Sequence, residues 1–395
     1  MKKIFTLIGI FAVGSLIAQD TTSTFDRQAA VNNYNAKPGK SKFMLRGFWF
    51  TGLDNLTNSE GESSSNFIGG GFNPILLYRQ SDRLFFEAEL EGQYDVNGGF
   101  ELGLGYANAS YVLNNYMTIR AGQFLLPFGT FTEKMHPSWI NKVNNAPLGF
   151  GHDGISPMAD IGMEIRGAFY TGSIKLNYQA YVINGPQLKD GSDEPDEAGG
   201  LKFGYMTDNN KNKTVGGRIG ILPLSNSSLE IGFSGMTGKV GTAESKYEDV
   251  TATLYAIDLS FVKNLNFMKS VVDIKGQYNG TNVSDADYLN PETGADYTFE
   301  NKSSGYYAQI AVRPSLLENK ILRNFEAVAR YSVLSTAEES LWAADPTQLT
   351  FGLNYWLDWR TVVKIGYQTT DGLGDHDTNE TISQNLFYVR VAMGF

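Results

Sequence analysis

The chain has 395 residues, no cysteine and a formal net charge of −10. The acidic balance argues against a nucleic-acid partner, because phosphates attract a basic protein face. The absence of cysteine excludes a disulfide framework and thiolate metal sites. Aromatic residues make up 13% of the chain, and 43 glycines accompany only 12 prolines, a composition that favours β structure.

Residues 1–18 have the pattern of a secretory signal. Lys2 and Lys3 precede the apolar stretch 4–18, which is too short for a comfortable transmembrane helix and ends on the small residue Ala18. We therefore expect cleavage after Ala18, export of the mature chain, and a short periplasmic segment over residues 19–40. No later apolar run reaches about eighteen residues, so no spanning helix is predicted. A closed β-barrel is the other structure that can cross a bilayer.

Alternation of apolar and polar residues with a period of two recurs along residues 41–395. Leu349, Phe351 and Leu353, for example, form an apolar face opposite Gln348 and Asn354. We count about sixteen such strands, which start near residues 42, 67, 83, 100, 115, 159, 173, 213, 228, 250, 268, 304, 323, 347, 361 and 384.

The links between the predicted strands alternate between long and short. The long links cover residues 54–66, 127–158, 185–212, 238–249, 279–302, 336–345 and 370–383, and the short links include residues 80–82, 171–173, 224–227 and 263–266. Bacterial outer-membrane barrels have an even number of strands, short periplasmic turns and longer external loops, whereas a soluble β-sandwich has no reason for this asymmetry. The sequence therefore predicts an all-β, transmembrane antiparallel β-barrel over residues 41–395, wide enough for an aqueous channel.

The third long link, residues 127–158, is far longer than a turn requires. We expect it to insert into the barrel and narrow the channel, with a short helix over residues 130–143. The polar groups of this predicted constriction are Glu133, Lys134, His136, Lys142, His152 and Asp153. The alternative is an ordinary surface loop with scattered charges.

The same alternation predicts which charged side chains point into the barrel. The predicted pore-lining cations are Arg46, Arg120, Arg166, Lys175, Arg218, Lys275, Arg330 and Arg390. Rings of Arg and Lys favour anions, so a mild anion preference is expected. In the alternative interpretation these charges pair with acidic groups on neighbouring strands.

The last strand completes the barrel pattern. It has one wholly apolar face, formed by Phe387, Val389, Val391, Met393 and Phe395. The opposite face carries Arg390, and the chain ends on phenylalanine. Outer-membrane barrels characteristically end in this way.

Two internal segments resemble a known family. The run Arg-Ala-Gly-Gln-Phe-Leu-Leu-Pro-Phe-Gly at residues 120–129 resembles the strand-to-loop motif of the phosphate-selective porin O and P family. Residues 324–332, Asn-Phe-Glu-Ala-Val-Ala-Arg-Tyr-Ser, are similar to a late strand of that family, and the closing strand 385–395 is similar as well.

This resemblance implies a sixteen-stranded, trimeric porin with its third loop inside the pore. The positions of this chain that match the family's motifs are Arg120, Glu326 and Arg330. The abundance of inward glutamates, such as Glu87 and Glu89, favours general diffusion over phosphate selection.

We therefore expect a passive diffusion channel for small hydrophilic solutes and ions in the outer membrane of a Gram-negative bacterium. The expected partners are outer-membrane lipid, small solutes or anions, and the other copies of a homotrimer. No cofactor or metal is predicted, and the acidic segments 190–197 and 371–377 are interpreted as solvated external turns. A closed structural or adhesive barrel stays open as an alternative. An outer-membrane enzyme would need a Ser–His pair on the lipid-facing side, and none of the three histidines lies in a predicted strand.

Overall fold

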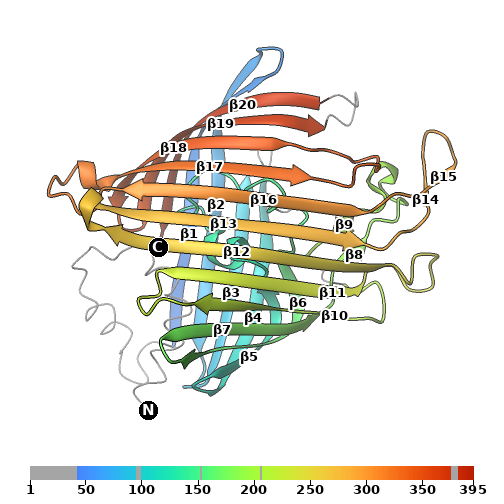
Figure 1. The fold of residues 1–395 in the computed structure, drawn as a ribbon, viewed down its shortest axis with the longest axis horizontal. Coiled ribbons are helices and arrows are strands. Elements are labelled where there is room, and N and C mark those ends of the chain that lie inside the picture. The colour runs from blue at the N-terminus through green and yellow to red at the C-terminus, as the bar shows by residue number, and fades with distance from the viewer. Residues whose placement is uncertain (1–41, 95–98, 152–153, 205–206, 375–380) are drawn as a thin grey trace.

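The computed structural model describes residues 42–94, 99–151, 154–204, 207–374 and 381–395. Sixteen antiparallel strands form one closed barrel, which confirms the predicted fold class (Figure 1). In order around the barrel these are β1 (Phe43–Asn58), β2 (Ser63–Arg79), β3 (Leu84–Tyr94), β4 (Phe100–Asn114), β5 (Met117–Leu125), β6 (Ala159–Thr171), β7 (Ile174–Ile183), β10 (Thr214–Leu222), β11 (Leu229–Lys239), β12 (Thr251–Leu265), β13 (Ser270–Val283), β16 (Lys302–Arg313), β17 (Phe325–Ser335), β18 (Thr347–Asp358), β19 (Thr361–Gly374) and β20 (Thr381–Gly394). The predicted signal and the segment 19–40 lie outside the described residues.

The first and last strands close the barrel. β1 pairs with both β2 and β20, and the backbone of Phe395 exchanges two hydrogen bonds with Gly47. Gly47 has a φ of 155°, and a Cβ at this position would lie 2.8 Å from the Phe395 ring. The same ring stacks on Phe72 at 5.8 Å between centroids. The terminal phenylalanine thus packs at the closing seam.

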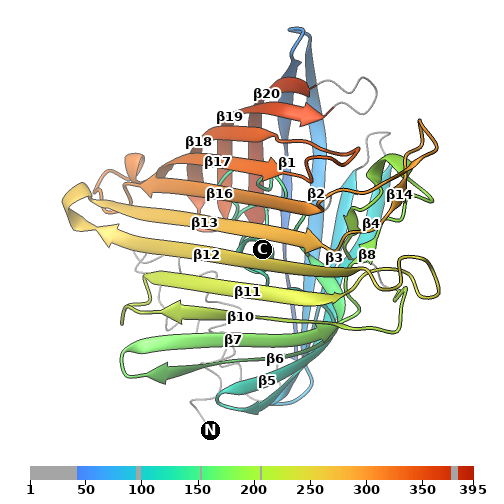
Figure 2. The ribbon, with the colours of Figure 1, turned by 45° about the vertical axis from the view of Figure 1, so that its right-hand side comes forward.

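The two ends of the barrel differ in their links. The links after β4, β6 and β18 are tight turns, and the longest link at that end covers residues 314–324. The opposite end, here called the long-loop end, carries residues 126–158, 184–213, 240–250, 284–301 and 336–346. Two of the long links were predicted too long. The predicted link 370–383 is shorter because β19 and β20 pair as far as Gly374 and Thr381. β1 and β2 extend further than expected, so residues 59–62 suffice to join them, and their hairpin projects beyond its neighbours (Figure 2).

The barrel wall is apolar outside and polar inside. On β18, Phe351 and Leu353 are 55% and 47% exposed, whereas Thr350 and Asn354 on the other face are buried. This reverses the arrangement of a soluble protein and suits a wall that faces hydrocarbon. The phase of β4 changes at Gly105, which is left unpaired where Glu89 and Leu90 pair with residues 106 and 104, a β-bulge.

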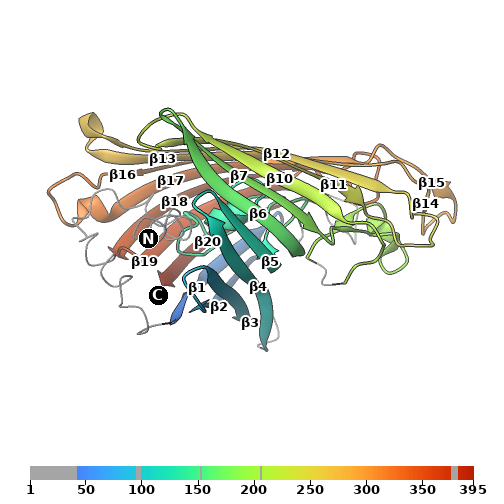
Figure 3. The same ribbon diagram turned by 90° about the horizontal axis from the view of Figure 1, so that it is seen from below.

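Short helices and hairpins lie in the interior and at the long-loop end. Within the described part of the chain, every helix is too short or too polar to span a bilayer. One α-helix, α3 (Phe131–Met135), lies in the third long link. Two small hairpins, β8 (Gln187–Leu188) with β9 (Leu201–Lys202) and β14 (Tyr288–Leu289) with β15 (Asp296–Tyr297), stand at the long-loop end. Figure 3 shows β1–β4 on the wall opposite β10–β13.

Candidate channel and its third loop

The third long link, residues 126–158, lies inside the barrel and is called the inner loop below. Its helix α3 is shorter than the predicted residues 130–143 because Pro137 follows. A proline has no backbone N–H and cannot donate the next hydrogen bond of a helix, so the helical conformation does not continue past His136, the C-cap. Beyond Pro137 the loop continues through turns whose polar groups bond to the barrel wall.

One set of contacts holds the start of the inner loop against β11 and β13. The backbone N–H of Gly129 donates to Ser234 Oγ at 3.0 Å. The N–H groups of Thr130 and Phe131 both donate to Gln277 Oε1, at 2.8 and 3.0 Å. Gly129 has a φ of 67°, and a Cβ there would overlap the Gln277 side chain. Glycine is therefore required where the loop turns into the lumen.

A second set of contacts holds the middle of the loop against β17, β18 and β19. Lys142 Nζ lies 2.5 Å from Glu326 Oε1, and both side chains are almost fully buried. Arg330 donates to the Asn141 side chain at 2.5 Å and to the Asn145 carbonyl at 2.7 Å. Lys364 Nζ donates to three backbone carbonyls of the loop, those of residues 138, 141 and 143. Buried cations thus fix the loop to this wall.

A third set of contacts lies toward β3, β5 and β6. Glu133 on α3 accepts a hydrogen bond from Arg166 at 2.6 Å and lies 3.8 Å from Arg120. Burial disfavours the Glu133 carboxylate, but the two guanidinium groups lower its pKa to about 2. Arg120 also pairs with Glu164 at 2.5 Å. The middle of α3 is therefore tied to the wall by a charged network.

His136 and Lys134 complete the contacts of α3. The Nε2 atom of His136 lies 3.7 Å from Glu89, and Lys134 pairs with Glu230 on β11 at 3.0 Å. Four of the six predicted constriction residues therefore lie in the lumen at wall contacts. His152 and Asp153 lie outside the described residues.

The predicted pore-lining cations all sit on the inner side, but they differ in how much water they meet. Arg120, Arg218, Arg330 and Arg390 are at most 8% exposed. Arg218 binds Asp258 through both branches of its guanidinium, at 2.6 and 3.0 Å. Most of these positive charges are thus neutralised by neighbouring groups and are not presented to the open lumen.

Four further predicted cations lie outside that buried group, and one of them is Arg166, which is paired with Glu133 as described above. Lys275 is paired with Asp273 at 2.6 Å. Arg46 and Lys175 are half-buried near the tight-turn end.

The long-loop end is covered on one side by an aromatic cap, formed by Tyr247, Tyr288, Tyr297, Phe299 and Trp342. Successive rings of the cap lie 5.5 to 6.3 Å apart, and the Trp342 indole donates to the Ala198 carbonyl at 2.9 Å. The cap continues into the barrel, where it packs on the inner faces of β7, β11 and β12 and on Phe128 of the inner loop. This side of the long-loop end is closed by apolar packing.

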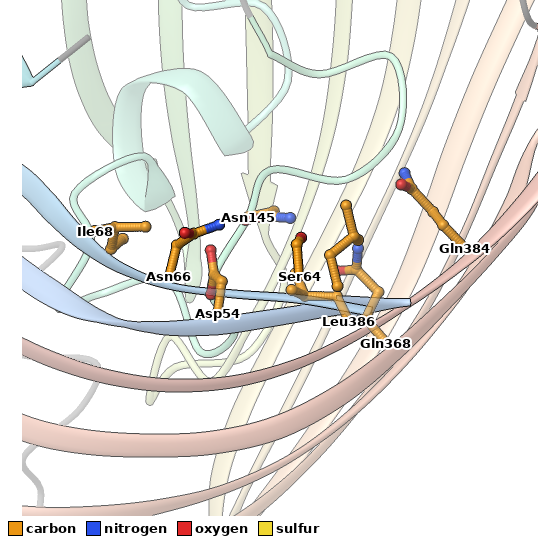
Figure 4. A pocket seen from close by; sticks show the side chains of 9 residues that line it. Asp54, Ser64, Asn66, Ile68, Asn145, Gln368, Gln384 and Leu386 are labelled. Carbon is orange, nitrogen blue, oxygen red and sulfur yellow. The ribbon is translucent and has the colours of Figure 1, made fainter. Parts of the chain in front are cut away.

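The opposite side of the long-loop end is hollow. A cavity of about 330 Å³ lies between the inner loop and β1, β2, β19 and β20 (Figure 4). It is lined by Asp54, Leu56, Ser64, Asn66, Ile68, Asn145, Gln368, Gln384 and Leu386. Beside it, the inner faces of β3 and β4 present the exposed side chains of Gln93 and Glu101.

Solved structures with this architecture include an anion-selective porin and an outer-membrane channel. The anion-selective porin from Comamonas acidovorans matches with a TM-score of 0.56 and 12% identity, over 90% of this chain and 100% of that one. The channel DcaP of Acinetobacter baumannii matches with a TM-score of 0.58 and 12% identity, over 90% of this chain and 99% of that one. OmpT of Vibrio cholerae, in a trimer form, matches with a TM-score of 0.51 and 10% identity, over 90% of this chain and 100% of that one. The chain has a porin fold. No family model and no curated protein sequence matches it.

Sequence reasoning about this porin fold missed the uncharged groups that hold the inner loop. Two of these groups, Gln277 and Asn354, face inward at positions that the alternation marks. Nothing in the local sequence distinguishes such a loop anchor from any other lumenal amide. Asn145 was missed because it lies in the loop itself. Among the residues that the structure describes, no cluster of His, Asp and Glu is arranged to hold a metal.

Proposed function

We propose that the chain is an outer-membrane porin, a passive diffusion channel for small hydrophilic solutes and ions. The observation that carries this proposal is the closed barrel with an apolar outer face, a polar inner face and a loop inserted across its lumen. A polar lumen of this strand number suits an aqueous path. The proposal assigns the chain no catalytic role.

The same features support a location in the outer membrane of a Gram-negative bacterium. Bacterial barrels of this kind place their short turns in the periplasm and their longer loops outside. In that orientation the aromatic cap and the cavity face the exterior, and the start of β1 and the end of β20, which meet at Gly47, face the periplasm. Outer-membrane lipid would contact the exposed apolar side chains of the wall.

We infer that solutes pass along one side of the lumen. The long-loop halves of β1–β4, β19 and β20, called the open wall, bear the cavity and exposed polar groups such as Asn66 and Glu101. The inner side of β10–β18, called the closed wall, carries the aromatic cap and most contacts of the inner loop. A route along the open wall would avoid both.

Selectivity and assembly are finer parts of the proposal. Arg120 is buried and paired with Glu164, and Arg330 is buried and hydrogen-bonded to the inner loop, which supports a general pore rather than phosphate capture, although the family resemblance includes both residues. The mild anion preference stays a prediction, since Arg46 and Lys175 near the tight-turn end are opposed by Glu101 near the long-loop end. A homotrimer is proposed because a structure with this fold is described in a trimer form.

The decisive experiment is conductance of the purified protein in planar bilayers. We expect step-like openings of uniform size, followed by a reversal potential in a KCl gradient that gives the ion preference. The absence of steps at any voltage would favour the alternative, a closed structural or adhesive barrel. A pore that passes K⁺ better than Cl⁻ would contradict the anion preference alone.

A further inference from the structure

The cavity beside the inner loop has the chemistry of a binding site rather than of plain channel wall. Four of its nine lining side chains are primary amides, those of Asn66, Asn145, Gln368 and Gln384. Each amide offers two N–H donors and a carbonyl acceptor. Figure 4 shows these groups on both sides of the space, with Asn145 contributed by the loop and the others by the wall.

The amides of this cavity are available to a ligand. Among the described residues, the side-chain amides of Asn66, Asn145 and Gln384 have no hydrogen-bond partner. The backbone carbonyl of Asn145 is held by Arg330 at 2.7 Å, so this residue is fixed in place while its side chain stays free. A preorganised polar group binds a ligand without first losing conformational freedom.

The charge of the cavity is balanced. Its single carboxylate, that of Asp54, is paired with Arg390 at 2.7 Å. The pair therefore leaves the cavity without net charge, which suits a polar ligand that is itself neutral.

Aliphatic side chains complete the lining. Leu56, Ile68 and Leu386 come from β1, β2 and β20 and face the same space as the amides. A saccharide combines hydroxyl groups, which both donate and accept, with apolar C–H faces. A zwitterionic amino acid or peptide would instead bring charges that compete with the Asp54–Arg390 pair. The volume of about 330 Å³ lies at the lower end of the range for small-molecule pockets, which suits a short sugar.

We propose that this cavity binds a small neutral saccharide on its way through the lumen, an inference that rests on the proposed porin function. The lining contains no aromatic ring to stack on a sugar, so binding is weak. Weak binding is what a channel requires, because a solute must leave the site as readily as it enters.

The test is block of single-channel current by sugars, measured in planar bilayers with glucose, maltose and maltotriose. We expect the ion current to fall in a saturable manner with a dissociation constant in the millimolar range. The double variant Asn66→Ala/Gln384→Ala removes two unpartnered amides and should weaken the block about tenfold, with the block of each protein expressed relative to its own current in sugar-free buffer. The control Gln93→Ala removes an inward amide outside the cavity and should keep wild-type block.

The possible outcomes separate the two proposals. A protein that never conducts overturns the porin function and this inference with it. Normal conductance without saturable block by any of the three sugars overturns the saccharide site alone. Equal block in the wild type and the double variant overturns its location. Stronger block by the dipeptide glycylglycine than by sugars overturns the ligand class. Binding of maltose to the detergent-solubilised protein, followed by saturation-transfer NMR and repeated on both variants, gives the same comparison if either variant fails to insert into bilayers.

Discussion

The open wall and the closed wall are built from the same kind of alternating strands, but their inward-facing side chains differ in what they contact. On the closed wall, inward charges are consumed by partners, as in the pairs Lys142–Glu326 and Arg218–Asp258. On the open wall, inward groups such as Asn66 and Glu101 are exposed, and a cavity remains. The difference teaches that facing the lumen is not the same as lining the pore. The inner loop decides which inward residues meet water.

The largest expected effect comes from removing the inner loop from the lumen. Replacement of residues 137–150 by a short Gly-Ser link should raise single-channel conductance several-fold, because the closed wall would then also become accessible. Shortening the loop at residues 242–248, at the rim of the barrel, is the matched control and should leave conductance unchanged. Wild-type conductance after loss of the inner loop would place it outside the conduction path.

The next effect tests how firmly the closed wall holds the loop. Lys142→Met should destabilise the protein by about 3–5 kcal/mol, because the buried Glu326 carboxylate loses its partner. The double variant Lys142→Met/Glu326→Gln should recover part of that loss. Urea unfolding in detergent measures the free energies, and noisier channel steps in the single variant would accompany the loosened loop. Equal stability of the single and double variants would contradict a coupled pair.

A smaller effect is expected from charge on the open wall. Glu101→Gln should shift the reversal potential in a KCl gradient toward anions. The change in permeability ratio should be at most about fivefold, since an exposed charge interacts by no more than about 1 kcal/mol. Glu62→Gln, at the tip of the β1–β2 hairpin, is the control and should leave the potential unchanged. A shift of the same size in both variants would show a general surface effect.

The smallest effect on conduction should come from the aromatic cap. Tyr288 is 1% exposed, and Tyr288→Ala should leave a hole that lowers the local stability of the external loops by about 3 kcal/mol. Hydrogen exchange of the loops should accelerate while single-channel conductance stays at the wild-type value. Leu289→Ala, at an adjacent position that is 56% exposed, should change neither. Altered conductance in Tyr288→Ala would place the cap on the solute route.

Much of the fold was predictable because a strand is a local pattern. The strands follow from a two-residue period interrupted by turn residues, and the structure confirms that there are sixteen of them in one closed barrel. The error at the β1–β2 link has a simple cause. The serines and asparagines of residues 54–66 are typical of loops, yet residues from both strands pair up to Thr57 and Ser63, since pairing in a hairpin satisfies backbone groups whatever the side chains.

The sequence by itself determined the barrel, its inward and outward faces and the presence of a long third link. Only the tertiary structure decided where that link goes and which charges it covers. The partners of a lumenal residue lie far along the chain, as Lys142 lies 184 positions from Glu326, and no periodicity encodes such a pair. Burial of a charge is stable only when a partner or hydrogen bond compensates it. The path of one loop therefore separates anchoring charges from a wall that is left open to solutes.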